Sequence, residues 1–131
     1  MMCTYFISGH LDLSKKEFQA HYMPQLEAVI QNGGKFIVGD ARGADSLAQK
    51  YLIGQPVIVY HIGSTPRNNY GNFMTQGGFK SDADRDAQMT ADSDVDILWI
   101  RSAAEQQKRL GAKYDPNYIN GTTKNMLRRQ K

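Results

Sequence analysis

The stretch KFIVGDARGADSLAQKYL, residues 35–52, combines a short apolar run, a glycine-rich turn and a helical pattern. Residues 35–39 predict a buried strand, because the run is apolar and ends at a glycine. The apolar residues that follow recur with helical spacing and predict one face of a helix. They are Ala44, Leu47, Ala48, Tyr51 and Leu52. A strand that leads through a tight turn into a helix is the repeating unit of an α/β protein.

The same alternation of strand and helix patterns continues on both sides of this unit. Further strands are predicted at residues 4–8, 56–61 and 95–100, and further helices at residues 14–32, 81–90 and 122–129. Ser14 and Glu17 form a capping-box pattern at the start of the first helix, and Pro24 is expected to kink or split that helix. Residues 62–80 are predicted to be irregular, and residues 101–120 to form a long connection or insertion.

Helical crossovers between strands predict parallel pairing, because they return the chain in the same direction. We therefore expect an open parallel α/β sheet of four to five strands with helices on both faces, in one domain that spans residues 1–131. With the four predicted strands numbered along the chain, the expected order is 3-2-1-4. Ligands of such sheets bind beyond the carboxyl ends of the strands, near the point where the strand order reverses.

The composition indicates a folded chain without disulfides. The chain has 131 residues, of which 40% are hydrophobic and 22% charged, and its one cysteine, Cys3, excludes an internal disulfide. No apolar run reaches the ~18 residues of a membrane span, and no basic segment precedes an apolar one at the N-terminus. We expect a cytoplasmic protein that does not contact a membrane.

The basic residues are concentrated at the C-terminal end. Residues 101–131 carry eight basic and two acidic side chains, a net charge of +6. The favoured interpretation is a solvated helix with cations near its C-terminus. The alternative is a surface that meets a polyanion such as DNA, or a partner chain. The sequence leaves open whether the chain forms a homo-oligomer.

Three loops at the expected carboxyl edge combine glycines with hydroxyl groups. Glycine lets backbone N–H groups approach an oxyanion closely, and a helix N-terminus adds unpaired donors. These loops therefore predict a phosphate cradle, to which the arginine of the helix at residues 81–90 is a further candidate. The predicted ligand-binding residues are Ser8, Gly9, His10, Gly39, Asp40, Arg42, Gly43, Ala44, Asp45, Arg85, Gly121, Thr122 and Thr123.

Three side chains at this edge, Asp40, Asp45 and His10, are candidates for acid–base chemistry. The aspartates at alternate positions in residues 82–86 and 92–96 lack the glycine and glutamate of a calcium-binding loop, so we predict no metal site. Asp96 stands in an apolar strand and is expected to face solvent or to pair with a basic side chain. The aromatic residues of the 62–80 segment would either stack on a base or pack this loop onto the domain.

The string FIVGDARGADSLA, residues 36–48, resembles the second-strand signature of the SLOG superfamily of Rossmann-like domains. The resemblance extends to residues 6–10, 85–89, 91–92 and 121–126, and so spans most of the chain. This superfamily includes YspA-type stand-alone proteins, the DNA-processing protein DprA and the LOG phosphoribohydrolases. The resemblance implies a Rossmann-like fold and a nucleotide or nucleotide-derived ligand, with phosphate near residues 8–10 and 121–123.

One position departs from the pattern of the LOG hydrolases. In that pattern a glutamate follows the Gly-Thr pair after two intervening residues, and here this position is Asn125. An amide cannot act as a carboxylate base or nucleophile. The leading hypothesis is therefore a module that binds a nucleotide as a sensor or carrier and requires no cofactor. The alternatives are a nucleoside-monophosphate N-glycosidase or related nucleotide-processing enzyme, and a DNA-associated protein that uses the basic tail.

Overall fold

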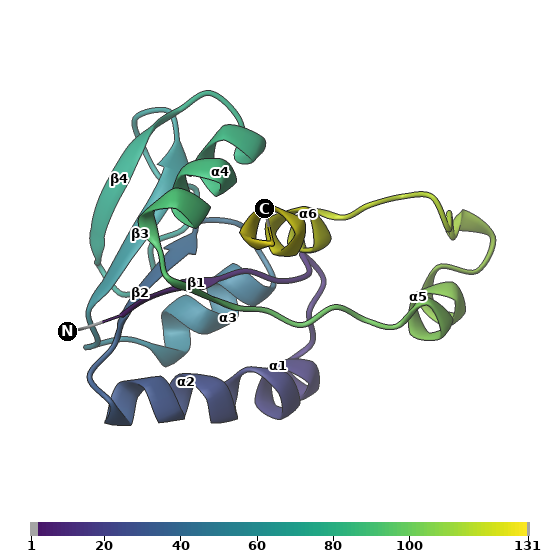
Figure 1. The fold of residues 1–131 in the computed structure, drawn as a ribbon, viewed down its shortest axis with the longest axis horizontal. Coiled ribbons are helices and arrows are strands. Elements are labelled where there is room, and N and C mark those ends of the chain that lie inside the picture. Colours follow the sequence, from purple (N-terminus) through teal and green to yellow (C-terminus); the bar gives the residue numbers. More distant parts are fainter. Residues whose placement is uncertain (1–2, 131) are drawn as a thin grey trace.

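The computed structural model describes residues 3–130, which form a five-stranded, all-parallel sheet between two layers of helices (Figure 1). The strands are β1 (Thr4–Ile7), β2 (Lys35–Gly39), β3 (Val57–Ile62), β4 (Met74–Phe79) and β5 (Val95–Ile97). The helices are α1 (Lys15–His21), α2 (Met23–Gln31), α3 (Ala44–Tyr51), α4 (Asp82–Asp92), α5 (Ala103–Leu110) and α6 (Gly121–Arg129), with a 3-10 helix, η1 (Gly111–Lys113). Across these residues, no helix is both long and apolar enough to cross a membrane.

The strand order is β4-β3-β2-β1-β5, and every neighbouring pair is parallel. This confirms the α/β class and the predicted order of four strands, because the fourth predicted strand is β5. The sequence analysis missed β4, which lies in the segment predicted to be irregular. Its sequence, MTQGGF, is exposed except at Phe79, so no hydrophobic alternation marks it as a strand.

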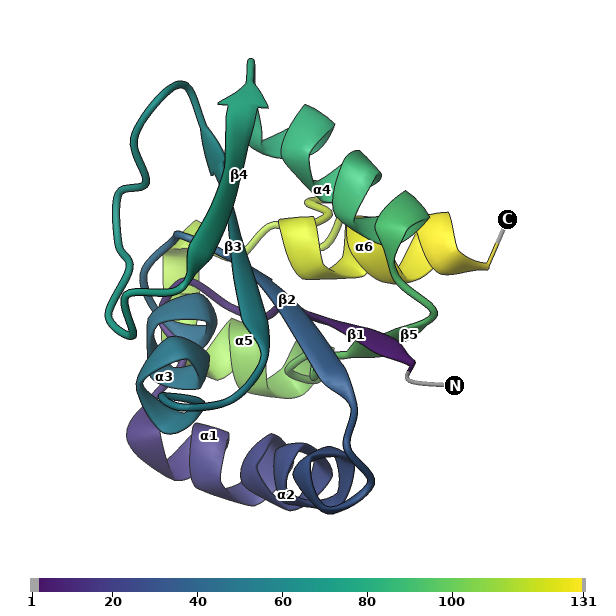
Figure 2. The same ribbon diagram turned by 90° about the vertical axis from the view of Figure 1, so that its left-hand side faces the viewer.

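Helices cover both faces of the sheet (Figure 2), and the buried residues form two separate core clusters. Ile7, Val38 and Val59 pack on the face that α1, α2 and α3 cover. Phe6 and Ile37 lie on the opposite face, which α4 and α6 cover. The sheet is thus buried on both sides, as parallel sheets are, and its carboxyl edge is the place where loops from both helical layers meet.

Tyr22 links the helical layer to the carboxyl edge. The first helix divides at this residue, with Pro24 in the first turn of α2, where proline is tolerated. The Tyr22 hydroxyl donates to the backbone oxygen of Ser8 at 2.7 Å and accepts from the Trp99 N–H at 3.1 Å. Because the Trp99 amide is bonded to Tyr22, β5 ends at Ile97 and does not continue to residue 100 as predicted.

Residues 102–119 form an arm that contains α5 and η1 and extends away from the sheet (Figure 1). Arg101 anchors its base, with a side chain only 1% exposed. The Arg101 guanidinium donates to both carboxylate oxygens of Glu17, each at 2.8 Å, and to Asp12 at 2.7 Å. The buried charge of Arg101 is therefore paired, and the arm starts from a fixed point beside α1.

Candidate functional site

A cavity of about 350 Å³ lies at the carboxyl edge of the sheet, between the ends of β1 and β2 and the helices α4 and α6. Eight of the predicted ligand-binding residues line it, from all three predicted loops and from α4. They are Ser8, Gly9, His10, Gly39, Asp45, Arg85, Gly121 and Thr122. The parallel sheet thus brings together segments that are more than a hundred residues apart in the sequence.

The loop after β1 places Ser8, which has a buried and unpaired hydroxyl, in the wall of this cavity. Ser8 is only 7% exposed, and its Oγ has no hydrogen-bond partner. Gly9 holds the loop close to its neighbours, because a Cβ there would collide with the Tyr22 hydroxyl and with the Cβ of Ala44. A buried hydroxyl without a partner costs free energy. The Ser8 Oγ can recover that cost by bonding to a molecule in the cavity.

The N-terminus of α6 forms the facing wall. The Asn120 side chain caps this helix by accepting from the Thr123 N–H at 2.8 Å. Gly121 and Thr122 are the first two helical residues, whose N–H groups have no acceptor within an α-helix. These donors and the positive end of the helix dipole favour an anion at this wall.

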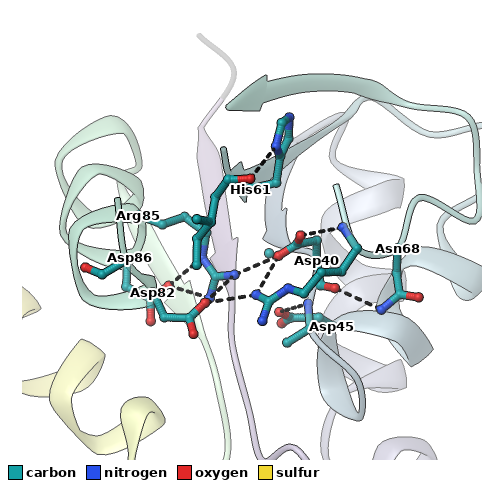
Figure 3. A network of polar contacts seen from close by, with 12 residues as sticks. Asp40, Asp45, His61, Asn68, Asp82, Arg85 and Asp86 are labelled. Atoms are coloured by element: carbon teal, nitrogen blue, oxygen red, sulfur yellow. Dashed lines mark hydrogen bonds and ion pairs between the residues drawn. The ribbon is translucent and has the colours of Figure 1, made fainter. Parts of the chain in front are cut away.

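Asp40 does not line the cavity but pairs with two arginines that do (Figure 3). Its side chain is 1% exposed and pairs with Arg67 at 2.8 Å and Arg85 at 2.9 Å. Burial alone would raise the pKa of Asp40, but the hydrogen bonds and charges of the two arginines outweigh it and hold this pKa below its ordinary value. Asp40 is therefore an ionised structural centre with both oxygens occupied, which is a poor arrangement for a general base.

Arg85 lines the cavity but is surrounded by carboxylates. Besides Asp40, it contacts Asp82 at 3.2 Å and Asp86 at 2.9 Å (Figure 3). Burial opposes its charge, but these carboxylates outweigh burial and keep the pKa of Arg85 above its ordinary value. The positive charge of Arg85 is thus largely neutralised before any ligand binds.

Asp45 is the carboxyl group most changed by its surroundings. It is buried in the cavity wall, and its Oδ2 accepts from the Ala41 N–H at 3.2 Å. Burial raises the pKa of Asp45 to about 7, although the nearby charge of Arg85 acts in the opposite direction. Gly39 is needed beside it, because a Cβ there would lie 2.6 Å from this same Oδ2. Asp45 can therefore gain or lose a proton near neutral pH.

His10 lines the cavity with its acceptor nitrogen already bonded. The backbone N–H of Arg101 donates to His10 Nε2 at 3.0 Å, which assigns the ring proton to Nδ1. Burial and then the charge of Arg101 lower the pKa of His10. The imidazole is therefore neutral and connects the first loop to the base of the arm.

Four predicted ligand-binding residues lie outside the cavity besides Asp40. Arg42 is exposed, and Thr123 faces a second cavity. The Ala44 N–H donates to the His10 backbone oxygen at 3.1 Å, so the N-terminus of α3 is closed by the first loop. Gly43 has φ +75°, and a Cβ there would collide with the backbone oxygens of that loop. These two residues therefore serve the corner between strand and helix.

Sequence reasoning missed several residues that line the cavity. They are Arg67, Asp82, Asp86, Gln106, Tyr118, Asn120 and Asn125. Asn120 had a recognisable signal, because asparagine is a favoured N-cap and directly precedes the Gly-Thr pair. Arg67 and Tyr118 come from segments without periodicity, so no pattern in the sequence indicated where the fold would place them.

Other predicted features find internal partners. Asp96 pairs with Arg129 at 2.9 Å, so this arginine of the basic tail joins α6 to β5. Phe73 packs against the core, and Phe79 stacks on Tyr60 with ring centroids 5.9 Å apart. The aromatic side chains of these two positions thus pack the 62–80 segment onto the domain. Among residues 3–130, no group of three histidine, cysteine or acidic side chains is arranged to hold a metal ion.

Comparisons with protein-family models, with curated proteins and with solved structures found no match to this chain. Its function is therefore argued from the geometry and chemistry of the cavity.

Proposed function

We propose that this chain binds a nucleotide or nucleotide-derived ligand in the cavity, with its phosphate between Ser8 and the N-terminus of α6, and acts as a sensor or carrier. The observation that carries the proposal is that Ser8, a 7% exposed residue whose Oγ has no hydrogen-bond partner, lines the same cavity as Gly121 and Thr122. Two independent features thus offer hydrogen-bond donors to one anionic group.

Phosphate recognition at this site relies on hydroxyl and amide donors. The guanidinium groups of Arg67 and Arg85 already pair with carboxylates within the protein. The backbone N–H groups of a helix N-terminus and the Ser8 hydroxyl are directional donors that the fold already holds in place, so the protein needs little rearrangement on binding. The site therefore selects a phosphate group by geometry more than by net positive charge.

The remaining lining residues suit the sugar part of a nucleotide. Asp82, an exposed residue, offers a carboxylate oxygen, and Gln106 offers its amide nitrogen, and both can bond to ribose hydroxyls. A volume of about 350 Å³ lies at the lower end of the roughly 300–1,000 Å³ typical of ligand sites. The resemblance of residues 36–48 to the SLOG signature supports the same class of ligand.

One observation favours a second function, the cleavage of an N-glycosidic bond. Asp45, with its pKa raised to about 7, would carry a proton near neutral pH and could protonate a departing base. In this alternative the cavity is a catalytic site and Asp45 is its general acid. Base release from nucleoside monophosphates, followed by chromatography, tests it, and stable nucleotides over a long incubation with the protein exclude it.

Calorimetric titration tests the binding proposal, with adenosine and guanosine monophosphates compared with the corresponding nucleosides. We expect only the phosphorylated forms to bind well. Ser8→Ala removes one hydrogen bond to a charged group, a loss of about 1.5–3 kcal/mol, so affinity should fall at least tenfold. The free protein should not lose stability, because the Ser8 Oγ has no partner to lose.

The matched control is Ser64→Ala, since Ser64 is exposed and lies outside the cavity. It should bind the nucleotides like the unchanged protein. Equal affinities for nucleoside and nucleotide, or a Ser8→Ala variant that binds as tightly as the control, would contradict the proposed phosphate position.

A further inference from the structure

A second cavity, of about 370 Å³, adjoins the first between the arm and α6. Three residues, Gln106, Tyr118 and Asn120, line both cavities. The two spaces are therefore neighbours that share a wall, and the arm, residues 102–119, supplies most of the second one.

The second cavity differs from the first in its chemistry. Its wall contains the rings of Tyr114 and Tyr118 and the aliphatic groups of Ile100, Leu110 and Pro116. Carboxylates dominate the first cavity, where Asp45, Asp82 and Asp86 come together, whereas Asp115 is the acidic residue of the second. The two tyrosine rings and the aliphatic groups suit the faces of a flat group, such as an aromatic ring or a base, and the polar side chains of Gln106, Lys113 and Asp115 can bond to its edge.

Tyr118 stands between the two spaces with an unusually free side chain. It is 73% exposed, although it is a large aromatic residue. Tyrosine at this exposure keeps much of its ring available for stacking, and stacking on aromatic side chains tolerates any flat ring. The partition between the cavities is therefore itself a surface that can bind part of a ligand.

The N-terminus of α6 lies at the junction of the two cavities. Gly121 and Thr122 line the first cavity, Thr123 lines the second, and their cap residue Asn120 lines both. A phosphate bound at this helix end has one cavity on each side. A phosphomonoester would fill only one of them, whereas a phosphate or pyrophosphate substituted at both ends would extend into both.

We propose that the ligand of this site is a two-part phosphate ester, in which a nucleoside in the first cavity is joined through phosphate at α6 to a second flat group in the arm cavity. This inference rests on the proposed function for the position of the phosphate. The arm cavity adds the ligand class: an organic pyrophosphate or phosphodiester is preferred over a mononucleotide.

Calorimetric titration of the full chain with three probes tests this inference. The probes are adenosine monophosphate, adenosine diphosphate and diadenosine pyrophosphate, which add first a phosphate and then a second flat group. We expect diadenosine pyrophosphate to bind roughly tenfold more tightly than adenosine diphosphate, because stacking of one further base typically contributes a factor of about five to one hundred.

Tyr114→Ala separates the two cavities, because Tyr114 lines the second and not the first. This variant should lose the tenfold gain of diadenosine pyrophosphate and keep the affinity for adenosine diphosphate. Tyr70→Ala is the matched control, since Tyr70 is an exposed tyrosine outside both cavities and should preserve the gain.

The outcomes separate the two proposals. If the mononucleotide binds and the second base adds no affinity, or if Tyr114→Ala keeps the gain, the arm cavity does not take part and only the inference of this subsection is overturned. If none of the three probes binds, the phosphate position itself is wrong, and both proposals fail. Backbone amide shifts at Lys113 and Tyr114 caused by diadenosine pyrophosphate, and not by adenosine diphosphate, would be direct support.

Discussion

The side-chain amide of Asn125 donates to Asp86 Oδ2 at 3.3 Å and joins α6 to α4 along one wall of the cavity. The other oxygen of Asp86 accepts from Arg85 at 2.9 Å. The position where the LOG resemblance implies a glutamate thus holds an uncharged side chain, and the carboxylate beside it comes from the neighbouring helix. An amide at this position pairs with Asp86, whereas a second carboxylate would repel it.

Asn125→Asp tests this relationship with almost no change in shape. We expect the variant to bind adenosine monophosphate more weakly at pH 8, because a second negative charge beside Asp86 repels the phosphate and loses the donor to Asp86 Oδ2. Near pH 5 the loss should shrink, since two adjacent carboxyls then share a proton. Calorimetric titration at both pH values measures the effect. Asn125→Ala, which removes the amide without adding charge, should show no such pH dependence.

Asp45 predicts a fall in stability as the pH rises. Its pKa is raised to about 7 in the folded protein, from an ordinary value near 3.8, so between these values the folded state holds a proton that the unfolded state has lost. Its contribution to the free energy of unfolding should therefore decrease by up to about 1.4 kcal/mol for each pH unit in that window. Asp45→Asn should remove this slope and be more stable than the unchanged protein at pH 8.

Urea denaturation at pH 5, 6, 7 and 8 measures the Asp45 effect. Asp84→Asn is the control, because Asp84 is an exposed aspartate in the first turn of α4. If the two variants show the same pH dependence as the unchanged protein, the carboxyl of Asp45 is not protonated by its burial.

The lowered pKa of Glu17 predicts the opposite pH dependence at acidic pH: the free energy of unfolding should fall as the pH falls. The hydrogen bond from Arg101 lowers the pKa of Glu17 to about 2 against the effect of burial, so its stabilisation is complete above about pH 4.5 and is lost as the pH falls towards 2. Glu17→Gln should destabilise the protein at pH 7, by less than the roughly 3–5 kcal/mol of a fully broken buried pair, because Asp12 still contacts Arg101.

The comparison for Glu17 is Glu105→Gln, at the same third position of α5. Glu105 is exposed and bonds only to Ser102, so its replacement should change the midpoint of thermal unfolding little. Equal effects of the two substitutions would show that the Arg101 contact contributes nothing to the stability of the arm.

Alanine substitutions at Gly43 and Gly33 distinguish the cost of backbone strain from the cost of side-chain crowding. Both glycines have φ +75°, but a Cβ at Gly33 meets nothing within 4 Å, whereas at Gly43 it collides with the loop after β1. Gly33→Ala should cost about 1–2 kcal/mol, the penalty for a side chain in the left-handed region. Gly43→Ala should cost clearly more and displace His10. Chemical denaturation of both variants gives the difference, and equal losses would show that the crowding at Gly43 relaxes freely.

The strands could be predicted where both faces of the sheet are covered by helices. β1, β2 and β3 read as apolar runs because parallel strands are covered on both faces, and the helical spacing after residue 43 identified α3. β4 could not be predicted, since its exposed side chains carry no pattern and its pairing depends on backbone bonds to β3. The early end of β5 depends on the hydrogen bond from Trp99 to Tyr22, a contact between residues 77 positions apart.

The site was predictable to a similar degree. Ser8, Gly121 and Thr122 were predicted to lie together because they stand at a strand end and a helix start, and all three line one cavity, whereas phosphate binding there stays a prediction. Part of the second loop differs from the prediction. Gly43 and Ala44 pack the N-terminus of α3 against the first loop, and Asp40 forms ion pairs and does not line the cavity. Which residues of a loop face the cavity depends on packing against segments that are distant in the sequence.

The exposed edge strand β4 affects how readily molecules of this protein can aggregate in concentrated solution. β4 is one of the two terminal strands and contains no charged residue, so its backbone could pair with strands from other molecules. Gly77 and Gly78 interrupt that pairing, because glycine favours strands poorly and Gly78 has φ +91°. These two glycines at the exposed edge therefore disfavour edge-to-edge aggregation.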